Sequence, residues 1–433
     1  MDSDVLTVHA EDSIWQARDT NMKRHMYRLT HNNIVGGRIG QIIPVLRMEV
    51  LPGDSFQGRV GILCRFKGFA KPVLSPTYLD FYMFYVPNRL AWDGWEDFIT
   101  EGTGTIPTWD PADPNGANWT LVNSDDTQNA LFHRGYNLIW NEYFRDEDDA
   151  EVAIDDYVNE PRNAYELREM YNELRNEPEQ GTDSSFDGSV TGSTATIQAA
   201  DARDALRLLR LKERRSMFGD RYFDILRSYG VKTNYNMLER PESLGRSRHV
   251  VSFTDIPATS TTSGGSTVGD LAGHGIVGLH HRLPRKAFSE HGYIYGLAVV
   301  RPQQITYTSS PYDTFKTQMS DYWAPEYDGQ SPQEIQFRHV RNTYLTSTVG
   351  YVPKFQEYRK AHSFMANNFD DKQWTFGQAI PGTNVDDARN GLRQVDPTDY
   401  DQAFNSTSAD EPHYRALVHN SITAYRLVAN QSR

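Results

Sequence analysis

Cysteine is nearly absent from this 433-residue chain, which has Cys64 alone. A single thiol cannot form an internal disulfide framework, and it cannot supply a cysteine-based zinc cluster. Cys64 lies in a strand-like run beside Arg65, with no histidine near it in the sequence to activate a nucleophile. We therefore predict that its side chain serves packing.

Long apolar runs are absent too, because no stretch approaches the roughly 18 apolar residues of a membrane-spanning helix. The beginning of the chain, MDSDVLTVHAEDS, has neither the basic nor the apolar region of a signal peptide. These two absences predict a soluble protein that is not secreted.

Positive charge is in deficit, because 44 Lys and Arg residues face 57 Asp and Glu residues and give a formal net charge of −13. Neutralising a nucleic acid requires a positive surface. So acidic a chain is expected to make only local contacts with DNA, leaving most of the neutralisation to a separate basic partner. Repulsion between like-charged subunits would also make any assembly sensitive to salt or cations.

Aromatic residues are plentiful: they make up 12% of the chain, with 24 Tyr, 20 Phe and 8 Trp, although hydrophobic residues reach only 38%. This composition is typical of a folded, loop-rich protein with much polar surface. The length allows one large domain or several ordinary ones.

The clearest structural pattern lies in the stretch LDFYMFYVPNRLAWDGWEDFITEG, residues 79–102. Its first part, Leu79–Val86, is aromatic or branched on both alternating faces, and Asp80 is its only charge. This pattern predicts a core strand that is covered on both sides. Pro87 is expected to end the strand because proline cannot donate to a ladder, and Asn88 suits a turn.

A helix is predicted after this turn. Asp93 can cap its amino end, with Glu96 three residues further on, and Gly102 stands where a helix stops. Four large apolar side chains are expected along one stripe of this helix: Trp92, Trp95, Phe98 and Ile99.

Alternating or continuous apolar runs predict further strands. They lie in the segments 39–50, 56–73, 292–302 and 415–428. Helical spacing appears after Pro161, over Asp201–Tyr229, and in the segment 131–145, where one face carries Phe132, Tyr136, Ile139 and Tyr143. Polar or Gly-rich composition predicts loops at 103–126, 181–196, 231–248 and 258–270.

Strand patterns at both ends of the chain, with helices and loops between them, favour one antiparallel β-sandwich with very long insertions. We expect an amino-terminal arm over residues 1–35 and a single domain over residues 36–433. The insertions are expected at about 103–275 and 303–410.

The sequence predicts no catalytic residue, no metal ligand and no cofactor site. Four histidines fall in one Gly-rich segment, which reads as a loop without an HExxH motif, so a surface or interface role is favoured; these are His274, His280, His281 and His291. The acidic stretch DEDDAEVAIDD lacks EF-hand spacing, although a weak cation site between subunits stays open. A carboxylate pair for glycoside hydrolysis also stays open, because any two acids can meet in a fold.

Arginines crowd the predicted long helix and the loop after it. The candidate contacts for DNA or for an acidic partner are Arg207, Arg210, Arg214, Arg215, Arg246 and Arg248. The alternative is a solvated charged face that nearby acids balance. Single-stranded DNA would also need exposed aromatic side chains on which its bases can stack.

Several motifs, in order along the chain, carry a family resemblance. They are GRIGQIIPV, PGDSF, FYVPNRL with its Trp-rich continuation and DFITEG, LFHRGYNLIWNEYFR, DRYFDILRSYGVKTNY with RPE, LPRKAFSEHGYIYGLAVVRP, GYVPKFQEYR and YDQAF. In these motifs the chain resembles the major capsid proteins (F proteins) of Microviridae, small tailless bacteriophages with circular single-stranded DNA. The matches span Gly36 to Val428, although the chain lacks the very long insertion that forms surface protrusions in the gokushovirus branch.

The resemblance implies an eight-stranded antiparallel jelly roll in a virion, assembled in the host cytoplasm into a T=1 icosahedral shell of about sixty copies around a single-stranded DNA genome. It implies that the protein acts by associating with other subunits and does not catalyse a reaction. The implied partners are a pentameric spike protein at the fivefold axes, a small basic DNA-binding protein, a pilot protein and scaffolding proteins. The expected core or interface anchors are Phe84, Tyr85, Trp92, Trp95, Trp323 and Tyr327.

Two other classes of protein remain open from the residues alone. A carbohydrate-binding β-sandwich would share the fold, and an uncharacterised hydrolase would need a pair of carboxylates. Neither class explains the ordered series of motifs.

Overall fold

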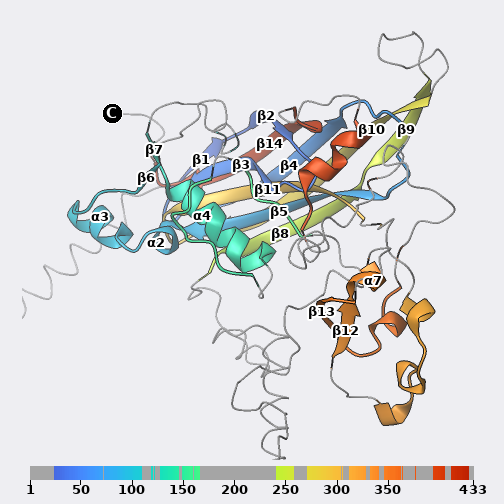
Figure 1. Cartoon of the computed structure of the whole chain (residues 1–433). Coiled ribbons are helices and arrows are strands. Elements are labelled where there is room, and N and C mark those ends of the chain that lie inside the picture. Colours follow the sequence, from blue (N-terminus) through green and yellow to red (C-terminus); the bar gives the residue numbers. More distant parts are fainter. Residues whose placement is uncertain are drawn as a thin grey trace, which may run out of the picture.

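The computed structural model describes residues 24–71, 73–109, 119, 121, 127–145, 149–158, 160–165, 240–257, 271–303, 305, 312–327, 332–340, 346–361, 363, 376, 394–404 and 411–428. Two antiparallel sheets packed against each other form its centre (Figure 1). A smaller lobe with its own two-stranded sheet lies beside them. Within the described residues, no helix is long and apolar enough to cross a membrane.

The first sheet has the strand order β1-β14-β4-β10-β9, and β2 also pairs with β14. Its strands are β1 (His25–Arg28), β2 (His31–Gly37), β4 (Ser55–Phe66), β9 (Ser252–Pro257), β10 (Leu271–Ala287) and β14 (Tyr414–Arg426). Because β1 and β2 pair with successive parts of β14, they act as one interrupted strand along its edge.

The second sheet has the order β3-β11-β5-β8. Its strands are β3 (Ile43–Val50), β5 (Thr77–Pro87), β8 (Glu242–Val250) and β11 (Gly292–Pro302). Two small sheets pair β12 (Gln333–Gln336) with β13 (Thr348–Val352), and β6 (Thr108–Trp109) with β7 (Gln128–Asn129).

The helical elements in the described part of the chain are short. The α-helices are α2 (Asn88–Ala91), α3 (Trp95–Glu101), α4 (Leu131–Ile139) and α7 (Phe337–Val340), and the π-helix η2 (Trp140–Phe144) continues α4. Turns of 3₁₀-helix are η4 (Tyr312–Phe315), η5 (Met319–Asp321), η6 (Pro325–Tyr327), η7 (Gln356–Tyr358) and η8 (Pro397–Ala403).

The main core fills the space between the two sheets. Alternate residues of β4, Val60, Ile62 and Cys64, point inward and pack in one cluster with residues of β5 such as Phe81 and Met83. Burial raises the pKa of the Cys64 thiol to about 12, so the thiol stays protonated and packs as a small apolar side chain. This is the packing role that the sequence predicts.

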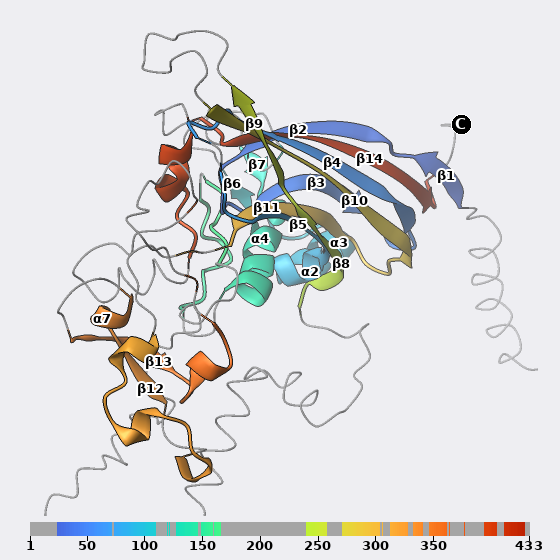
Figure 2. The same ribbon diagram turned by 90° about the vertical axis from the view of Figure 1, so that its right-hand side faces the viewer.

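A second core lies on the other side of the β3-β11-β5-β8 sheet, where α4 covers it (Figure 2). Phe132 of α4 stacks on Tyr295 of β11 at 4.4 Å between ring centroids. Gly135 permits this approach, because a Cβ there would collide with the Tyr295 hydroxyl. The predicted core strand is therefore buried on both faces, since β5 contributes to both clusters.

Around β5 the sequence predictions are partly correct. The strand ends at Pro87 and Gly102 is a left-handed C-cap with φ 68°, both as predicted. Asn88 opens α2 and does not form a turn. The predicted Asp93 cap is wrong, because Gly94 is the N-cap of α3, so Trp92 lies between the two helices.

Farther along, three predicted elements are confirmed by the described structure. The segments 292–302 and 415–428 form β11 and β14, and the helix at 131–145 exists as α4 and η2. The sequence predicts a loop over 231–248, whereas β8 begins at Glu242. Strands β8 and β9 lie within the range 103–275 that was expected to be an insertion, and β1 and the first part of β2 lie within the expected arm over residues 1–35. The predicted helices after Pro161 and over Asp201–Tyr229 lie outside the described residues.

Candidate functional site

The arginine candidates of the described chain lie on β8, at the edge of the second sheet. Asp80 of β5 faces Arg248 directly across the strands, and Arg301 of the next strand reaches the same carboxylate. Arg248 donates to Asp80 Oδ2 over 2.8 Å, and Arg301 Nε donates to that oxygen over 3.2 Å. Arg301 also donates to the Tyr165 carbonyl and to the Tyr82 hydroxyl.

This cluster fixes the charges of its members. Burial acts to raise the pKa of Asp80, but hydrogen bonds and charges from Arg248 and Arg301 outweigh it and lower that pKa. The hydrogen bond to Asp80 raises the pKa of Arg248 in turn. Asp80 therefore ties three strands together through Arg248 and Arg301, whereas Arg246 is exposed and lies 5.9 Å from the ring centroid of Tyr82.

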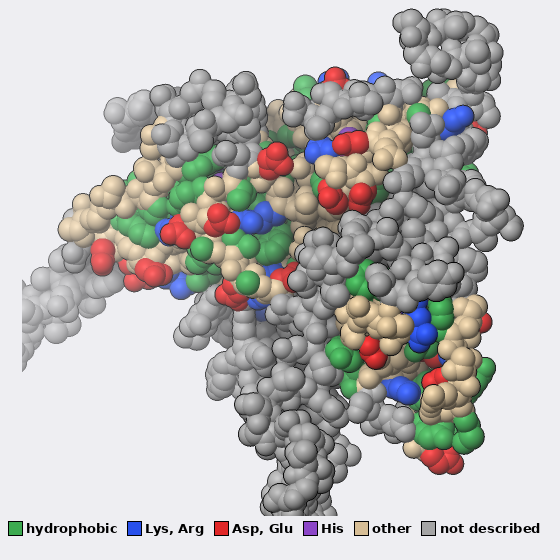
Figure 3. Space-filling view, viewed as in Figure 1, with side chains coloured by type: hydrophobic (Ala, Val, Ile, Leu, Met, Phe, Trp, Pro, Cys, Tyr) green, Lys and Arg blue, Asp and Glu red, His purple; other side chains and the backbone are tan. Residues whose placement is uncertain are grey.

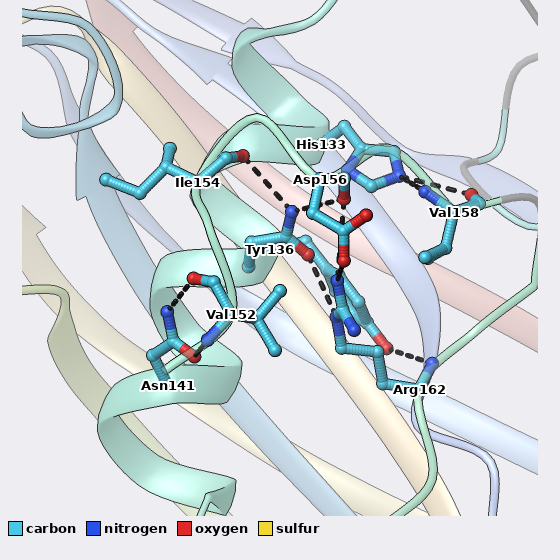
Figure 4. Close-up of polar contacts among 9 residues, drawn as sticks. His133, Tyr136, Asn141, Val152, Ile154, Asp156, Val158 and Arg162 are labelled. Atoms are coloured by element: carbon cyan, nitrogen blue, oxygen red, sulfur yellow. Dashed lines mark hydrogen bonds and ion pairs between the residues drawn. The ribbon is translucent and has the colours of Figure 1, made fainter. Parts of the chain in front are cut away.

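A second polar cluster lies on the outer face of α4 (Figure 4). Asn137 Nδ2 donates to the carbonyls of Ile154 and Asp156, over 3.1 and 2.9 Å. Asn141 exchanges two hydrogen bonds with the backbone of Val152, over 2.7 and 3.0 Å. These bonds hold the segment 152–158 along the helix.

The helix positions that make these contacts are spaced by four residues. His133, Asn137 and Asn141 lie on one face of α4 and η2, beside the apolar face that packs on the sheet. Burial lowers the pKa of His133 to about 4, so its ring is neutral. This set was not predicted, although the four-residue spacing of His and Asn beside an apolar stripe was a usable signal in the sequence.

Tyr136 and Arg162 complete the attachment. The Tyr136 hydroxyl donates to the Ile42 carbonyl over 2.9 Å and accepts from the Arg162 amide over 3.0 Å. Arg162 Nε donates to Asn137 Oδ1 over 3.1 Å. A single tyrosine hydroxyl therefore joins the helix, the start of β3 and the returning segment.

A third cluster joins a segment near the beginning of the described chain to two segments near its end. His413 Nδ1 accepts from the Ile39 amide over 3.1 Å, so its proton is on Nε2, which lies 2.6 Å from Asp401 Oδ1. Arg38 donates to both oxygens of the same carboxylate over 3.0 Å. Burial lowers the pKa of His413 to about 4, against the opposing effect of Asp401.

These buried histidines predict acid lability. The pKa of His133, His339 and His413 is about 4 in the fold, below the ordinary value of 6.5. The unfolded chain thus binds more protons, and stability is complete above about pH 6.5 and falls as the pH drops toward 4. Each histidine contributes up to about 3 kcal/mol over that interval.

Urea unfolding of the purified chain at about pH 7 and about pH 5 tests this expectation. His413→Gln removes one of the three groups, so its stability should depend less steeply on pH than that of the parent. Equal stability of the parent at both pH values would contradict the assignment.

The predicted aromatic anchors differ in how deeply their side chains are buried. Phe84 and Tyr85 are 2% and 6% exposed in β5. Trp92 and Trp95 are half-buried, and both pack on Phe98. Trp323 is 53% exposed and Tyr327 is half-buried, both in the smaller lobe.

The four histidines of the Gly-rich segment do not converge. His274, His280 and His281 lie in strand β10 and not in a loop, and His280 and His281 therefore point to opposite faces. His291 lies after this strand, directly before β11. His281 is buried against Phe81 with its Nδ1 2.8 Å from Ser247 Oγ, while His291 packs on Trp95. Within the described ranges, no group of three or more His, Cys, Asp or Glu residues is arranged to hold a metal ion.

The remaining arginine candidates, Arg207, Arg210, Arg214 and Arg215, lie outside the described residues. In the described chain, the polar clusters bind its own backbone and side chains and so hold long connections onto two sheets. This construction defines the class of the protein as an antiparallel two-sheet β-protein with long connections.

Comparison with known proteins identifies the family. The model of the family described as capsid protein (F protein) matches residues 16–176 and 189–432. The chain is similar to capsid protein F of Escherichia phage G4, with 24% identity over 435 residues that cover 94% of this chain and 96% of that protein. It is similar to capsid protein F of Escherichia phage alpha3, at 26% over 407 residues, 89% of this chain and 92% of that protein.

A further relative is capsid protein VP1 of Bdellovibrio phage phiMH2K, at 22% identity over 456 residues that cover 83% of this chain and 85% of that protein. The chain belongs to the capsid protein (F protein) family of the Microviridae. Its role is structural and not enzymatic.

Proposed function

We propose that this chain is the subunit of a T=1 icosahedral capsid that encloses a circular single-stranded DNA genome. The observation that carries the proposal is the order of its strands, taken with a family match over most of the chain. Closed shells are built from identical subunits related by symmetry, and this shell would contain about sixty.

The strand order supports an eight-stranded jelly roll. The two sheets would be β2-β14-β4-β10 and β3-β11-β5-β8, with β1 and β9 as additions at the edges. Along the chain, strands alternate between the sheets except where β8 follows β5. The jelly-roll domain would then begin with β2, a few residues before residue 36.

The long connections are the proposed source of contacts between subunits. One runs from the end of β5 to β8 and the other from β11 to β14. The half-buried Trp92 and Trp95 lie on the first, and Trp323 and Tyr327 lie on the second. Large aromatic side chains that are only partly covered within one chain suit the centre of an interface.

The proposed partners are a spike protein at the fivefold axes, a small basic DNA-binding protein, a pilot protein and scaffolding proteins, with assembly in the host cytoplasm. The net charge of −13 supports the need for a basic partner. Arg246 and the four candidates outside the described residues stay proposed contacts for DNA or an acidic partner, and Arg248 suits this role less because it pairs with Asp80.

Expression of the chain with and without its neighbouring viral genes tests the proposal by sedimentation and negative-stain microscopy. We expect icosahedral particles about 30 nm across, or pentamers that close when the scaffolding proteins are added. A chain that stays monomeric or dimeric with every partner supplied would overturn it.

A further inference from the structure

One broad face of the molecule is not covered by any described helix. Helices α2, α3 and α4 all lie on the side of the β3-β11-β5-β8 sheet, and the opposite sheet turns its outer face away from them (Figure 2). On β4, where alternate residues are buried, the outward positions are Arg59, Gly61, Leu63 and Arg65. Within the described part of the chain, no helix therefore covers the outer surface of β2, β14, β4 and β10.

This surface contains two pairs of arginines at facing positions of adjacent strands. Arg65 of β4 lies opposite Arg415 of β14, and Arg59 lies opposite Arg282 of β10. All four are exposed, and none forms an ion pair with a described residue. Like charges directly opposite each other destabilise a sheet, so each pair leaves an electrostatic cost that a bound anion would remove.

Other arginines of the described chain do have acidic partners. Arg248 and Arg301 share the buried Asp80, and Arg38 holds Asp401. On the face of α4, acidic and basic side chains are interspersed (Figure 3). In a chain with a net charge of −13, four unpaired arginines on one sheet face are therefore a local exception.

Two further rows lie between the arginine pairs. Leu417 faces Ile34 and Leu63 on its two neighbouring strands, and these side chains are 45%, 80% and 39% exposed. The next row places His419 and His280 on either side of Gly61. The rows between the arginine pairs contain no Asp or Glu.

The spacing is suitable for an extended polyanion. Arg59 and Arg65 are six residues apart on β4, and a strand rises about 3.3 Å per residue, so the arginine pairs lie about 20 Å apart. Between them, the His280 imidazole can donate to a phosphate, while the Nδ1 of His419 lies 2.6 Å from the Asn32 Oδ1 that accepts from it. The apolar row can contact sugars and bases. We name this surface, defined by Arg59, Arg65, Arg282, Arg415 and the two rows between them, the arginine face.

We propose that the arginine face binds the phosphodiester backbone of single-stranded DNA and is the surface of the subunit that lies toward the genome. This inference rests on the proposed function and deepens it, because it names where this acidic chain meets DNA. Charge complementarity favours a polyanion over the basic DNA-binding partner, and the β-sheet gives the four guanidinium groups a fixed spacing. The contact is local, as the net charge of the chain requires.

The test uses the full chain and a fluorescein-labelled oligodeoxythymidine. The variant R59Q/R65Q/R282Q/R415Q removes the four charges, and R338Q/R359Q changes two exposed arginines of the smaller lobe as a control. Anisotropy titrations at several salt concentrations give the slope of log K against log salt. Each phosphate contact on a single strand contributes about 0.7, so we expect the magnitude of the slope to fall by about 2.8 in the four-site variant and to stay unchanged in the control.

The four-site variant should also melt at the same temperature as the parent or higher, because it loses two like-charge pairs. An unchanged slope in a folded four-site variant, or an equal drop in the control, would overturn the inference. Loss of particle formation with unchanged DNA affinity would show that the face joins subunits. If the parent never forms particles but its DNA affinity depends on these arginines, the proposed function fails and this assignment stands.

Discussion

Replacing Asp80 by Asn should destabilise the protein by about 3 to 5 kcal/mol, the usual cost of removing one partner from a buried ion pair. The Asp80 side chain is 1% exposed and that of Arg301 is 11% exposed. Without the carboxylate, Arg301 keeps a desolvated charge whose remaining contacts are a carbonyl and a hydroxyl. The three strands β8, β5 and β11 would lose the group that joins them.

Glu290→Gln is the matched control. Glu290 pairs with Arg89, but these side chains are 39% and 35% exposed, and water can replace the lost contact. The expected loss is therefore within about 1 kcal/mol. Urea unfolding of both variants at neutral pH measures the difference, and an Asp80→Asn variant as stable as Glu290→Gln would show that the buried cluster contributes little.

The strands that could be predicted from sequence are those whose residues are apolar on both faces or alternate regularly. Most of them lie in the interior of their sheets, but β3 was predicted although it is an edge strand, because nearly all of its residues are buried. β5 and β11 are continuous apolar runs, and β14 alternates along its whole length. β8 was not predictable in this way, because it is an edge strand whose burial pattern shows no buried residue. β10 alternates correctly in Val277, Leu279 and Leu283, but Gly and His residues between them conceal the pattern.

The polar clusters could not be predicted from the sequence, and the reason is a different one. Asp80 bonds to residues 168 and 221 positions away, and His413 bonds to an amide 374 positions away. No periodicity encodes such pairings, since they depend on which strands become neighbours. A charge inside an apolar strand still marks the position: Asp80 is the only charge in a run buried on both faces, and such a group must have a buried partner.

The arginine face could not be predicted from the sequence for the same reason. Its four arginines come from β4, β10 and β14, and only the register between strands places them opposite one another. Basic residues that are close together in the sequence, such as Arg246 and Arg248 on β8, were the candidates that could be predicted. A sheet gathers residues across strands, whereas a helix gathers residues within a few positions.

Replacing Phe84 by Ala should cost about 3 to 5 kcal/mol, since it removes a buried ring and leaves a cavity. Phe84 is 2% exposed, and its ring lies 4.7 Å from Tyr143 and 6.2 Å from Phe144, where the π-helix packs on β5. The change should loosen the attachment of the first long connection and prevent folding before any assembly, which circular dichroism and urea unfolding would detect.

Trp323→Ala separates folding from assembly in the same experiment. Its side chain is 53% exposed, so the isolated chain should unfold within about 0.5 kcal/mol of the parent. If Trp323 anchors a contact between subunits, that variant should fold normally and yield fewer particles by sedimentation. A Phe84→Ala chain that forms particles as well as the parent would show that the second core is dispensable, and α4 would then serve only to carry the insertion.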